Sequence, residues 1–478
     1  MRACLCADLF NPSFLRHLIH DRPPRTSGAR VSLVQRRDDG FNEVFSDAIR
    51  WDGDYDDPAA WTDAVFSLTR KATEHLGGDA SRKIKSLCVS GTSASCLIVD
   101  GNGEPTRKPR MYNYDVLSSG DDRESAQKAL DLLDQHAPPR HTARANTGSL
   151  AKLVTWAIEK ELLDGEALCH QADYVTMKLL QTSGDPRPPI RSDWHNCLKC
   201  GYDVRNLQWP EWLHNCLESA GVKNVADVVP ESVVSPGAQL GSIAPEVAKE
   251  LGLSEDVVVV GGTTDSNAAF FAAVGGTRSN PGTAVTSLGS TLAMKQLSST
   301  FVEDASRGVY SHRFPCEDGS SEAWLIGGAS NVGCAVLRSE GFSNEELVEL
   351  SNAIDPSVDS PLSYYPLVKK GERFPVADSE KKPCLEPVPS SRAEYLHGIL
   401  QGITGVERDG FVVLGELGAS PSQPSLVWTC GGGSQNEVWT KMRQRKLRER
   451  FETDEIVVEK ASNTEASFGA AILAASSL

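Results

Sequence analysis

The chain has 478 residues, of which 40% are hydrophobic and 23% are charged, an ordinary balance that predicts two or three globular domains. Its 64 Asp and Glu outnumber 48 Lys and Arg, and the net charge of −16 argues against a nucleic-acid or anionic-membrane surface. No apolar run is long enough to span a membrane, so we expect neither nucleic acid nor membrane as a partner.

Residues 1–25 form an atypical N-terminal segment. They contain Arg2, Arg16, Arg22 and Arg25 but little Ser and only a weak apolar stretch, a poor match to an organelle transit peptide. A poor transit peptide and a wrongly assigned start are equal alternatives for this segment. The 12 Cys of the chain have no disulfide-like spacing, which favours free thiols in a reducing compartment.

Four segments, in chain order, each combine short apolar runs with a polar or glycine-rich turn. In residues 85–100 the turn is Gly-Thr-Ser, and in residues 256–274 four Val lead through Gly-Gly-Thr-Thr-Asp-Ser into an Ala-rich helix. Residues 281–297 predict a hairpin centred on residues 288–290. In residues 425–445 a strand leads through Gly-Gly-Gly-Ser-Gln-Asn into a helix.

Helices are predicted between these segments. Residues 59–74 and 393–407 carry apolar side chains at helical spacing. Strands that alternate with helices predict an α/β architecture with parallel or mixed sheets. Residues 274–281 are rich in Gly, Pro and Ser and indicate a domain boundary, whereas residues 372–389, rich in Pro and charge, predict a surface loop of the second domain.

The phosphate-binding pattern of P-loop enzymes is absent, because the sequence contains no Gly-Lys pair. The Gly, Thr and Ser turns at strand ends remain, and their N–H groups can hold phosphate oxygens. In residues 262–266 a buried strand delivers Asp265 to the start of a helix, which keeps its carboxylate ionised. Such a carboxylate suits the base for a phosphoryl-acceptor hydroxyl, but spacing alone favours an ordinary N-cap.

Three further turns admit two interpretations each. Residues 286–291 offer hydroxyls and amides to a transferred phosphate, or they form a plain hairpin turn. Residues 431–436 let a flat ligand approach the backbone, with Trp439 following to cover an adenine face, or they form a flexible loop. Residues 91–95 are similar and no more specific.

Cys197 and Cys200 form a Cys-x-x-Cys pair with His195 nearby. No second pair stands at a zinc-ribbon spacing, and no thioredoxin-like context follows. A zinc or redox site is therefore the minor interpretation, and we expect no protein metal site.

In this order, the turns together resemble those of the FGGY carbohydrate kinases, and the resemblance runs from Thr26 to the C-terminus. It implies an α/β fold with two ribonuclease-H-like domains of the actin-like ATPase type and a cleft between them. An N-terminal sugar-binding domain would span residues 26–276 and a C-terminal nucleotide-binding domain residues 277–478. The stretches that resemble the family are residues 26–30, 262–266, 281–291, 324–333, 430–439 and 463–474. Those that resemble its D-ribulose kinase branch are residues 111–115, 148–153, 170–174, 192–203, 308–312 and 364–375.

The resemblance implies a carbohydrate kinase that phosphorylates a ketopentose with ATP and Mg²⁺, with D-ribulose as the first expectation and D-ribulose 5-phosphate as its product. Xylulose and glycerol are the alternative substrates, and a non-catalytic nucleotide- or sugar-binding pseudokinase is the alternative from another class. The expected partners are the sugar and ATP. We expect a monomer or homodimer inside the cell, in the cytoplasm or a plastid.

The resemblance also assigns roles to single residues. It makes Asp265 the base for the sugar hydroxyl, which reverses the preference for an N-cap. The residues expected to bind the sugar with Asp265 are Ser27, Gly28, Arg30 and Ser93. Those expected to bind ATP and its phosphates are Thr26, Thr264, Ser290, Gly328, Gly432, Gly433, Asn436 and Trp439, the last four as an adenine slot.

The sequence departs from the family pattern at the first strand, which carries Asp-Phe-Gly-Thr before Ser-Gly-Ala-Arg. Pro23 takes the position of that Asp, and Pro cannot donate to a sheet ladder, so a strand before Thr26 is doubtful. Asp21 would need a local slip to reach the site. Ser90 is a smaller departure, since Asp is usual before Gly-Thr-Ser. Either residues 1–25 wrongly replace a true first exon, which the intact remaining turns favour, or the protein is a weakened kinase or pseudokinase.

Overall fold

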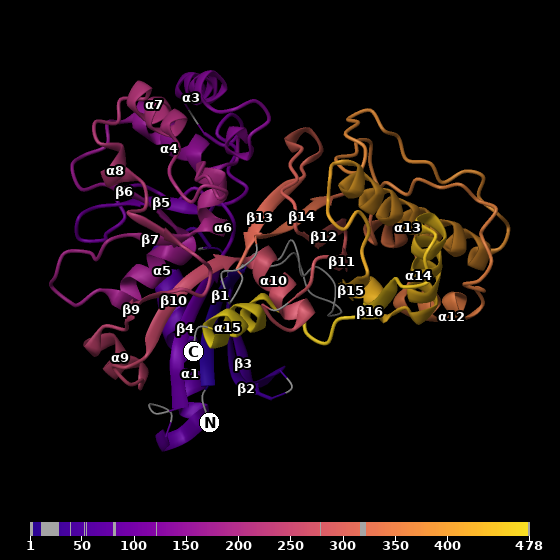
Figure 1. Ribbon diagram of the computed structural model, residues 1–478, viewed down its shortest axis with the longest axis horizontal. Coiled ribbons are helices and arrows are strands. Elements are labelled where there is room, and N and C mark those ends of the chain that lie inside the picture. Colours follow the sequence, from indigo (N-terminus) through magenta and orange to yellow (C-terminus); the bar gives the residue numbers. More distant parts are fainter. Residues whose placement is uncertain are drawn as a thin grey trace. The chain divides into compact units, whose positions relative to one another are not determined.

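The computed structural model of the chain divides into two compact units (Figure 1). Of the described residues, unit 1 comprises 3–277 and 465–476, and unit 2 comprises 279–464. The division lies beside the predicted boundary, but the prediction of one domain over 277–478 is corrected by the last helix, which belongs to unit 1. The residues that the structure describes are 3–10, 28–38, 40–51, 53, 55–79, 83–120, 122–277, 279–315 and 322–476.

The sheet of unit 1 mixes parallel and antiparallel pairs. Its strand order is β3 (Gly40–Arg50), β2 (Gly28–Arg37), β1 (Ala3–Phe10), β4 (Ile84–Gly91), β10 (Val258–Thr264) and β9 (Gln239–Ser242). β1 runs parallel to β4, and β4 runs parallel to β10. The other pairs are antiparallel. The carboxyl ends of β1, β4 and β10 therefore lie along one edge of the sheet.

Strand β1 corrects the expectation for the N-terminal segment. Residues 3–10 are a central strand of the sheet, with Leu5 and Leu9 fully buried. The resemblance placed the first strand just before Thr26, where Pro23 made a strand doubtful, and that stretch lies outside the described residues. The register puts Asp8 opposite Arg30 of β2 and Ser90 of β4, so the first strand carries an Asp. Residues 11–27 separate it from the Gly-Ala-Arg start of β2, so a contiguous motif could not be found.

Helices cover both faces of this sheet. On one face α1 (Pro58–Leu76) packs against β1, β2 and β3, together with α5 (Gln171–Leu180) and α9 (Pro245–Leu251). On the other face α15 (Ala466–Ser476) contacts β1, β2, β4 and α10 (Asp265–Val274), as Figure 1 shows. Each face has its own buried apolar cluster. α15 is apolar on all sides, which is expected for a helix that is buried throughout.

A third apolar cluster organises the remainder of unit 1. Residues of α3, α4 and α7 pack together there with the antiparallel pair of β5 and β6. These elements are β5 (Cys96–Val99), α3 (Arg123–His136), α4 (Ser149–Glu159), β6 (Ala167–His170), α7 (Glu211–Ser219) and α8 (Val225–Val228). Smaller elements are η1 (Gly77–Asp79), η2 (Thr142–Arg144), β7 (Arg191–Asp193), α6 (Trp194–Cys197), η3 (Leu198–Cys200) and β8 (Ser232–Val234).

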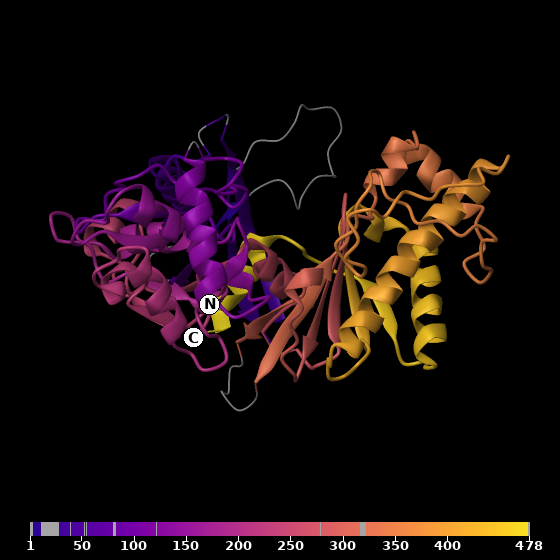
Figure 2. The same cartoon turned by 90° about the horizontal axis from the view of Figure 1, so that it is seen from above.

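Unit 2 is built on a second mixed sheet. Its order is β13 (Tyr310–Phe314), β14 (Ala323–Ala329), β12 (Leu292–Ser298), β11 (Thr283–Leu288), β15 (Leu426–Cys430) and β16 (Val457–Lys460). β11, β15 and β16 are mutually parallel, so their carboxyl ends share an edge. The helices are η4 (Ala305–Arg307), α11 (Ala335–Ser339), α12 (Asn344–Asn352), α13 (Arg392–Glu416), η5 (Gly432–Gln435) and α14 (Glu437–Phe451). α13 and α14 contact each other, and Figure 2 shows them as the two long orange and yellow helices of this unit.

Several sequence expectations are confirmed. The helices predicted over 59–74 and 393–407 lie within α1 and α13, and the predicted hairpin is formed by β11 and β12. The mixed α/β class is also confirmed. In the described part of the chain, no helix combines the length and apolarity needed to cross a bilayer.

Gly469 permits the close approach of α15 to α10. A Cβ at this position would overlap the carbonyl oxygen of Ala268 and lie 2.8 Å from the Ala272 nitrogen. We expect Gly469→Ala to destabilise unit 1 by about 1–3 kcal/mol, because backbone cannot move aside cheaply. Thermal unfolding measures this effect. The matched control is Gly405→Ala on α13, where a Cβ meets no atom within 4 Å and a gain of about 0.5–1 kcal/mol is expected. Equal effects of both substitutions would contradict the prediction.

Candidate functional site

The carboxyl ends of β4 and β10 lie side by side, because the strands pair in parallel with Gly91 opposite Thr264. β4 leads into the turn at residues 91–95, and β10 leads directly into α10. Ligands of open α/β sheets bind outside the carboxyl ends of the strands. The structure thus brings the predicted Gly-Thr-Ser turn and Asp265 to one edge of the unit 1 sheet.

Asp265 is the first residue of α10, and Thr264 occupies the N-cap position. This corrects the alternative interpretation of Asp265 as an ordinary N-cap. Asp265 Oδ1 accepts a hydrogen bond from the Ser266 N–H at 2.7 Å, and the residue is half-buried. Thr264 is 1% exposed, and its Oγ1 has no hydrogen-bond partner among the described residues. A carboxylate and an unsatisfied hydroxyl therefore stand together at the end of β10.

Lys199 adds a positive charge to this end of the sheet. Burial lowers the pKa of Lys199, and the nearby Asp265 carboxylate raises it. The lysine lies on η3 and is half-buried. The sequence analysis quoted its segment for the family resemblance but did not single it out, because one Lys in a polar stretch usually lies in solvent.

The turn at residues 91–95 presents Ser93 and buries its neighbours. Ser93 is half-exposed, whereas Thr92, Ala94 and Ser95 are buried. Thr92 donates from its N–H and its Oγ1 to Gln171 Oε1, at 3.1 and 2.9 Å. Ser95 Oγ accepts from the Tyr112 N–H at 2.9 Å. Contacts from inside the protein hold the turn, and of its residues 92–95 Ser93 is the one that reaches the surface.

Two of the remaining predicted sugar residues, Gly28 and Arg30, lie on β2, and Gly28 is its first residue. Ser27 lies outside the described residues, as does Thr26, which was predicted to bind phosphate. Arg30 forms an ion pair with Glu465, just before α15. A carboxylate of the protein thus already engages the guanidinium that was expected to line the sugar pocket.

In unit 2, the predicted phosphate turn joins β11 to β12. Ser290 is half-exposed at its tip. The Cys334 N–H donates to Gly289 O at 2.8 Å, and the Ala335 N–H donates to Ser290 O at 3.2 Å. Gly333 lies against this turn so closely that a Cβ would stand 2.6 Å from the Thr291 Cα. The turn is therefore rigidly supported.

The glycine loop after β15 reaches the same edge of the sheet. Gly431 has φ 83°, and a Cβ there would lie 2.6 Å from the Leu288 carbonyl oxygen. Gly432 begins η5. Only glycine combines this conformation with so close an approach. The loop and the Ser290 turn are therefore neighbours, as expected for two parts of one nucleotide site.

Trp439 corrects one predicted role. It is 1% exposed, and its Nε1–H donates to Thr404 Oγ1 at 2.9 Å. A Cβ on Gly433 would lie 2.6 Å from its ring. The indole therefore supports the glycine loop from the interior instead of covering a bound adenine. Asn436 caps α14 by accepting from the Trp439 N–H at 2.9 Å, and it donates to Ser351 Oγ at 2.8 Å.

Gly328 has a structural role on β14. A Cβ at this position would stand 2.6 Å from the ring of the fully buried Phe374. The space that the glycine leaves is therefore filled by protein and not by a nucleotide. Gly328 was predicted to bind ATP, and this contact gives the glycine a packing reason that does not depend on a nucleotide.

A buried ion pair stabilises the nucleotide-side sheet. Arg443 of α14 and Glu407 of α13 are at most 1% exposed and lie 2.6 Å apart. Arg443 also donates to Thr429 Oγ1 of β15 at 2.8 Å, and Glu407 accepts from Thr286 Oγ1 of β11 at 2.6 Å. These contacts link both helices to β11 and β15, the strands that lead into the Ser290 turn and the Gly431 loop.

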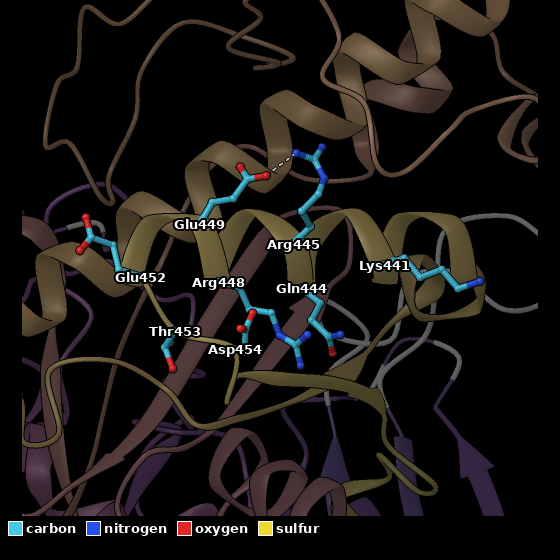
Figure 3. Close-up of a pocket in the computed structure, with 8 residues that line it drawn as sticks. All are labelled: Lys441, Gln444, Arg445, Arg448, Glu449, Glu452, Thr453 and Asp454. Atoms are coloured by element: carbon cyan, nitrogen blue, oxygen red, sulfur yellow. Dashed lines mark hydrogen bonds and ion pairs between the residues drawn. The ribbon is translucent and has the colours of Figure 1, made fainter.

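Two other features do not contribute to the site. A pocket of about 500 Å³ lies along α14 and includes Lys441, Arg448 and Asp454 (Figure 3), but none of the predicted site residues. Burial raises the pKa of the Cys197 and Cys200 thiols, which disfavours the thiolates that zinc needs. Among the described residues, no cluster of three His, Cys, Asp or Glu is arranged to hold a metal.

The chain is similar in sequence and in fold to known sugar kinases. No family model matches the chain. The chain is 23% identical, over 88% of its length and 79% of the relative's, to a xylulose kinase of Staphylococcus epidermidis. It has the fold of a xylulose kinase from Rhodospirillum rubrum, with a TM-score of 0.74, 18% identity, and coverage of 99% of this chain and 89% of that one. It also matches a Plasmodium falciparum glycerol kinase with ADP, with a TM-score of 0.73, 15% identity and coverage of 99% and 89%. The predicted two-domain, actin-like ATPase fold class is thereby confirmed.

Proposed function

We propose that the protein is an ATP-dependent carbohydrate kinase and that its substrate is a ketopentose, with D-ribulose as the first candidate. The observation that carries the proposal is Asp265, a half-buried carboxylate at the start of α10 that lies at the same sheet edge as the Ser93 turn. Similarity to a xylulose kinase along most of the chain supports the reaction class. The D-ribulose preference is supported only by the stretches that resemble that branch.

In the proposed reaction, unit 1 binds the sugar and unit 2 binds the nucleotide. Ser93 donates or accepts a hydrogen bond to the sugar, and Asp265 orients the reacting hydroxyl and accepts its proton. Amides and the hydroxyl of the Ser290 turn hold phosphate oxygens, and the loop at Gly432 and Gly433 lies beside the nucleotide. These groups act by positioning and electrostatics, which provide most of the catalysis of phosphoryl transfer.

The residues at the sheet edge fit Mg²⁺ as a cation delivered with ATP. Mg²⁺ binds through one or two carboxylates together with substrate phosphates, which agrees with the half-buried carboxylate of Asp265. Asp265 would hold it, and the bound ion would offset phosphate charge.

A screen of ATP consumption tests the substrate. Purified protein is mixed with ATP, Mg²⁺ and one of D-ribulose, D-xylulose or glycerol, and ADP release is followed. The proposal expects the highest kcat/KM with D-ribulose. A higher value with D-xylulose or glycerol would replace the substrate and keep the reaction class. Binding of sugar or nucleotide without any turnover would favour the pseudokinase.

Asp8 gives a second test, because the pseudokinase alternative depended on a missing first-strand Asp. The backbone register places Asp8 beside Ser90, near the carboxyl ends of β1 and β4. We expect Asp8→Asn to lower kcat by about 10²-fold, the usual loss when one preorganised electrostatic group is removed. Asp47→Asn is the control, since Asp47 lies on the edge strand β3 and pairs with Lys71 at 2.7 Å. Unchanged turnover in Asp8→Asn would exclude a role for this carboxylate.

A further inference from the structure

Lys152 is a fully buried lysine whose contacts are directed at the candidate sugar turn. It lies on α4 with 0% exposure. Its Nζ donates to the carbonyl oxygens of Ala94 at 2.8 Å and Met111 at 2.7 Å. Nζ forms no ion pair with any carboxylate of the described residues. Burying an amine without a counter-charge is costly, so two backbone carbonyls alone are weak compensation.

The conformation of the turn explains what Lys152 does there. Ala94 has φ 64°, a left-handed conformation that is unfavourable for a residue with a Cβ. This conformation directs the Ala94 carbonyl toward Lys152, and the same turn leaves Ser93 half-exposed. Met111, the other acceptor, precedes Tyr112, whose N–H holds Ser95 Oγ at 2.9 Å. One buried amine therefore joins the Ser93 turn to the segment at Met111 and Tyr112 that supports it.

We propose that Lys152 is a positioning residue for the sugar, which holds the turn at residues 91–95 in the conformation that presents Ser93 and so sets the affinity for the sugar without touching it. This inference rests on the proposed function of Ser93.

Substitution of Lys152 by Met tests this role, because Met has a similar length and cannot donate. We expect the KM for the sugar to rise about 10- to 100-fold, the range for losing charge-assisted hydrogen bonds, with the KM for ATP unchanged. The matched control is Thr155→Val on the same helix, a buried hydroxyl that donates to Ala151 O at 2.7 Å and to nothing else in the described part of the chain. Thr155→Val should leave both KM values unchanged.

A double-mutant cycle separates positioning from general stabilisation. If Lys152 acts through Ser93, then Lys152→Met should raise the sugar KM strongly in the wild-type chain and only about 2-fold in a Ser93→Ala background. A purely structural role would lower the melting temperature and leave the sugar KM of Lys152→Met unchanged, which overturns the inference. Loss of turnover with every sugar in the wild-type protein would instead overturn the proposed function, and this inference with it.

The pH dependence offers an independent readout. Burial lowers the pKa of Lys152 to about 8, and the charged or titratable groups around it are Cys96, Lys199 and Arg110. Burial raises the pKa of Cys96 to about 11. As the pH rises through about 8, Lys152 loses its proton and its bonds to the two carbonyls weaken. The sugar KM of the wild-type enzyme should therefore rise above pH 8, and this step should be missing in Lys152→Met, which retains Lys199. The same step in both proteins would exclude Lys152 as its origin.

Discussion

Replacing Asp265 with Asn is expected to lower kcat for sugar phosphorylation by about 10²–10⁴-fold, the contribution typical of a positioned general base. Asn has the shape of Asp but cannot accept the proton of the sugar hydroxyl. It can still accept the hydrogen bond from the Ser266 N–H, so the start of α10 should be preserved. Steady-state kinetics with the preferred sugar measures the loss.

Two controls make the result specific to the carboxylate. The affinity for ATP without Mg²⁺, measured by calorimetry, should be unchanged, because the Ser290 turn and the loop at Gly432 and Gly433 belong to unit 2. Asp256→Asn removes an exposed carboxylate just before the same strand, β10, and should leave kcat unchanged. If Asp265→Asn retains wild-type turnover, or if it also abolishes ATP binding, the proposed role of Asp265 is wrong.

The strand-and-turn motifs could be predicted because each is local in sequence. The Val run and the Ala-rich stretch after it placed Asp265 at a helix start, although β10 continues through Thr264 where the sequence predicted a turn. Parallel pairing of β4 with β10 then determines that Ser93 and Asp265 share an edge of the sheet. Such features follow from propensity and connectivity, which a single sequence contains.

Features that depend on distant partners could not be predicted in this way. Asp8 was missed because residues 11–27 separate β1 from β2, although the two strands pair in the sheet. The side chains of Trp439 and Lys152 are of types usually assigned to ligands or solvent, yet both are buried, at 1% and 0% exposure. Only tertiary packing shows that one supports Gly433 and the other holds Ala94. The final helix α15 was placed in the wrong domain for the same reason, since its partners lie in unit 1.

Removing Arg443 is expected to have the largest effect on stability. Arg443→Met leaves the carboxylate of Glu407 buried without its counter-charge, and breaking a buried pair in this way costs about 3–5 kcal/mol. We expect a corresponding loss in the free energy of unfolding of unit 2, measured by urea denaturation. Hydrogen exchange should locate the loss in β11 and β15, because Thr286 and Thr429 are bonded to the pair.

The control and the double variant decide whether the unpaired buried charge causes the loss of stability in Arg443→Met. Arg408→Met breaks the exposed pair with Asp409, for which about 0–1 kcal/mol is expected. Arg443→Met combined with Glu407→Leu removes both charges and should recover much of the loss, since apolar replacement of a buried pair is often close to neutral. If the double variant is as unstable as Arg443→Met, packing and not charge is responsible. The KM for ATP should rise in Arg443→Met, because the strands that the pair links lead into the Ser290 turn and the Gly431 loop.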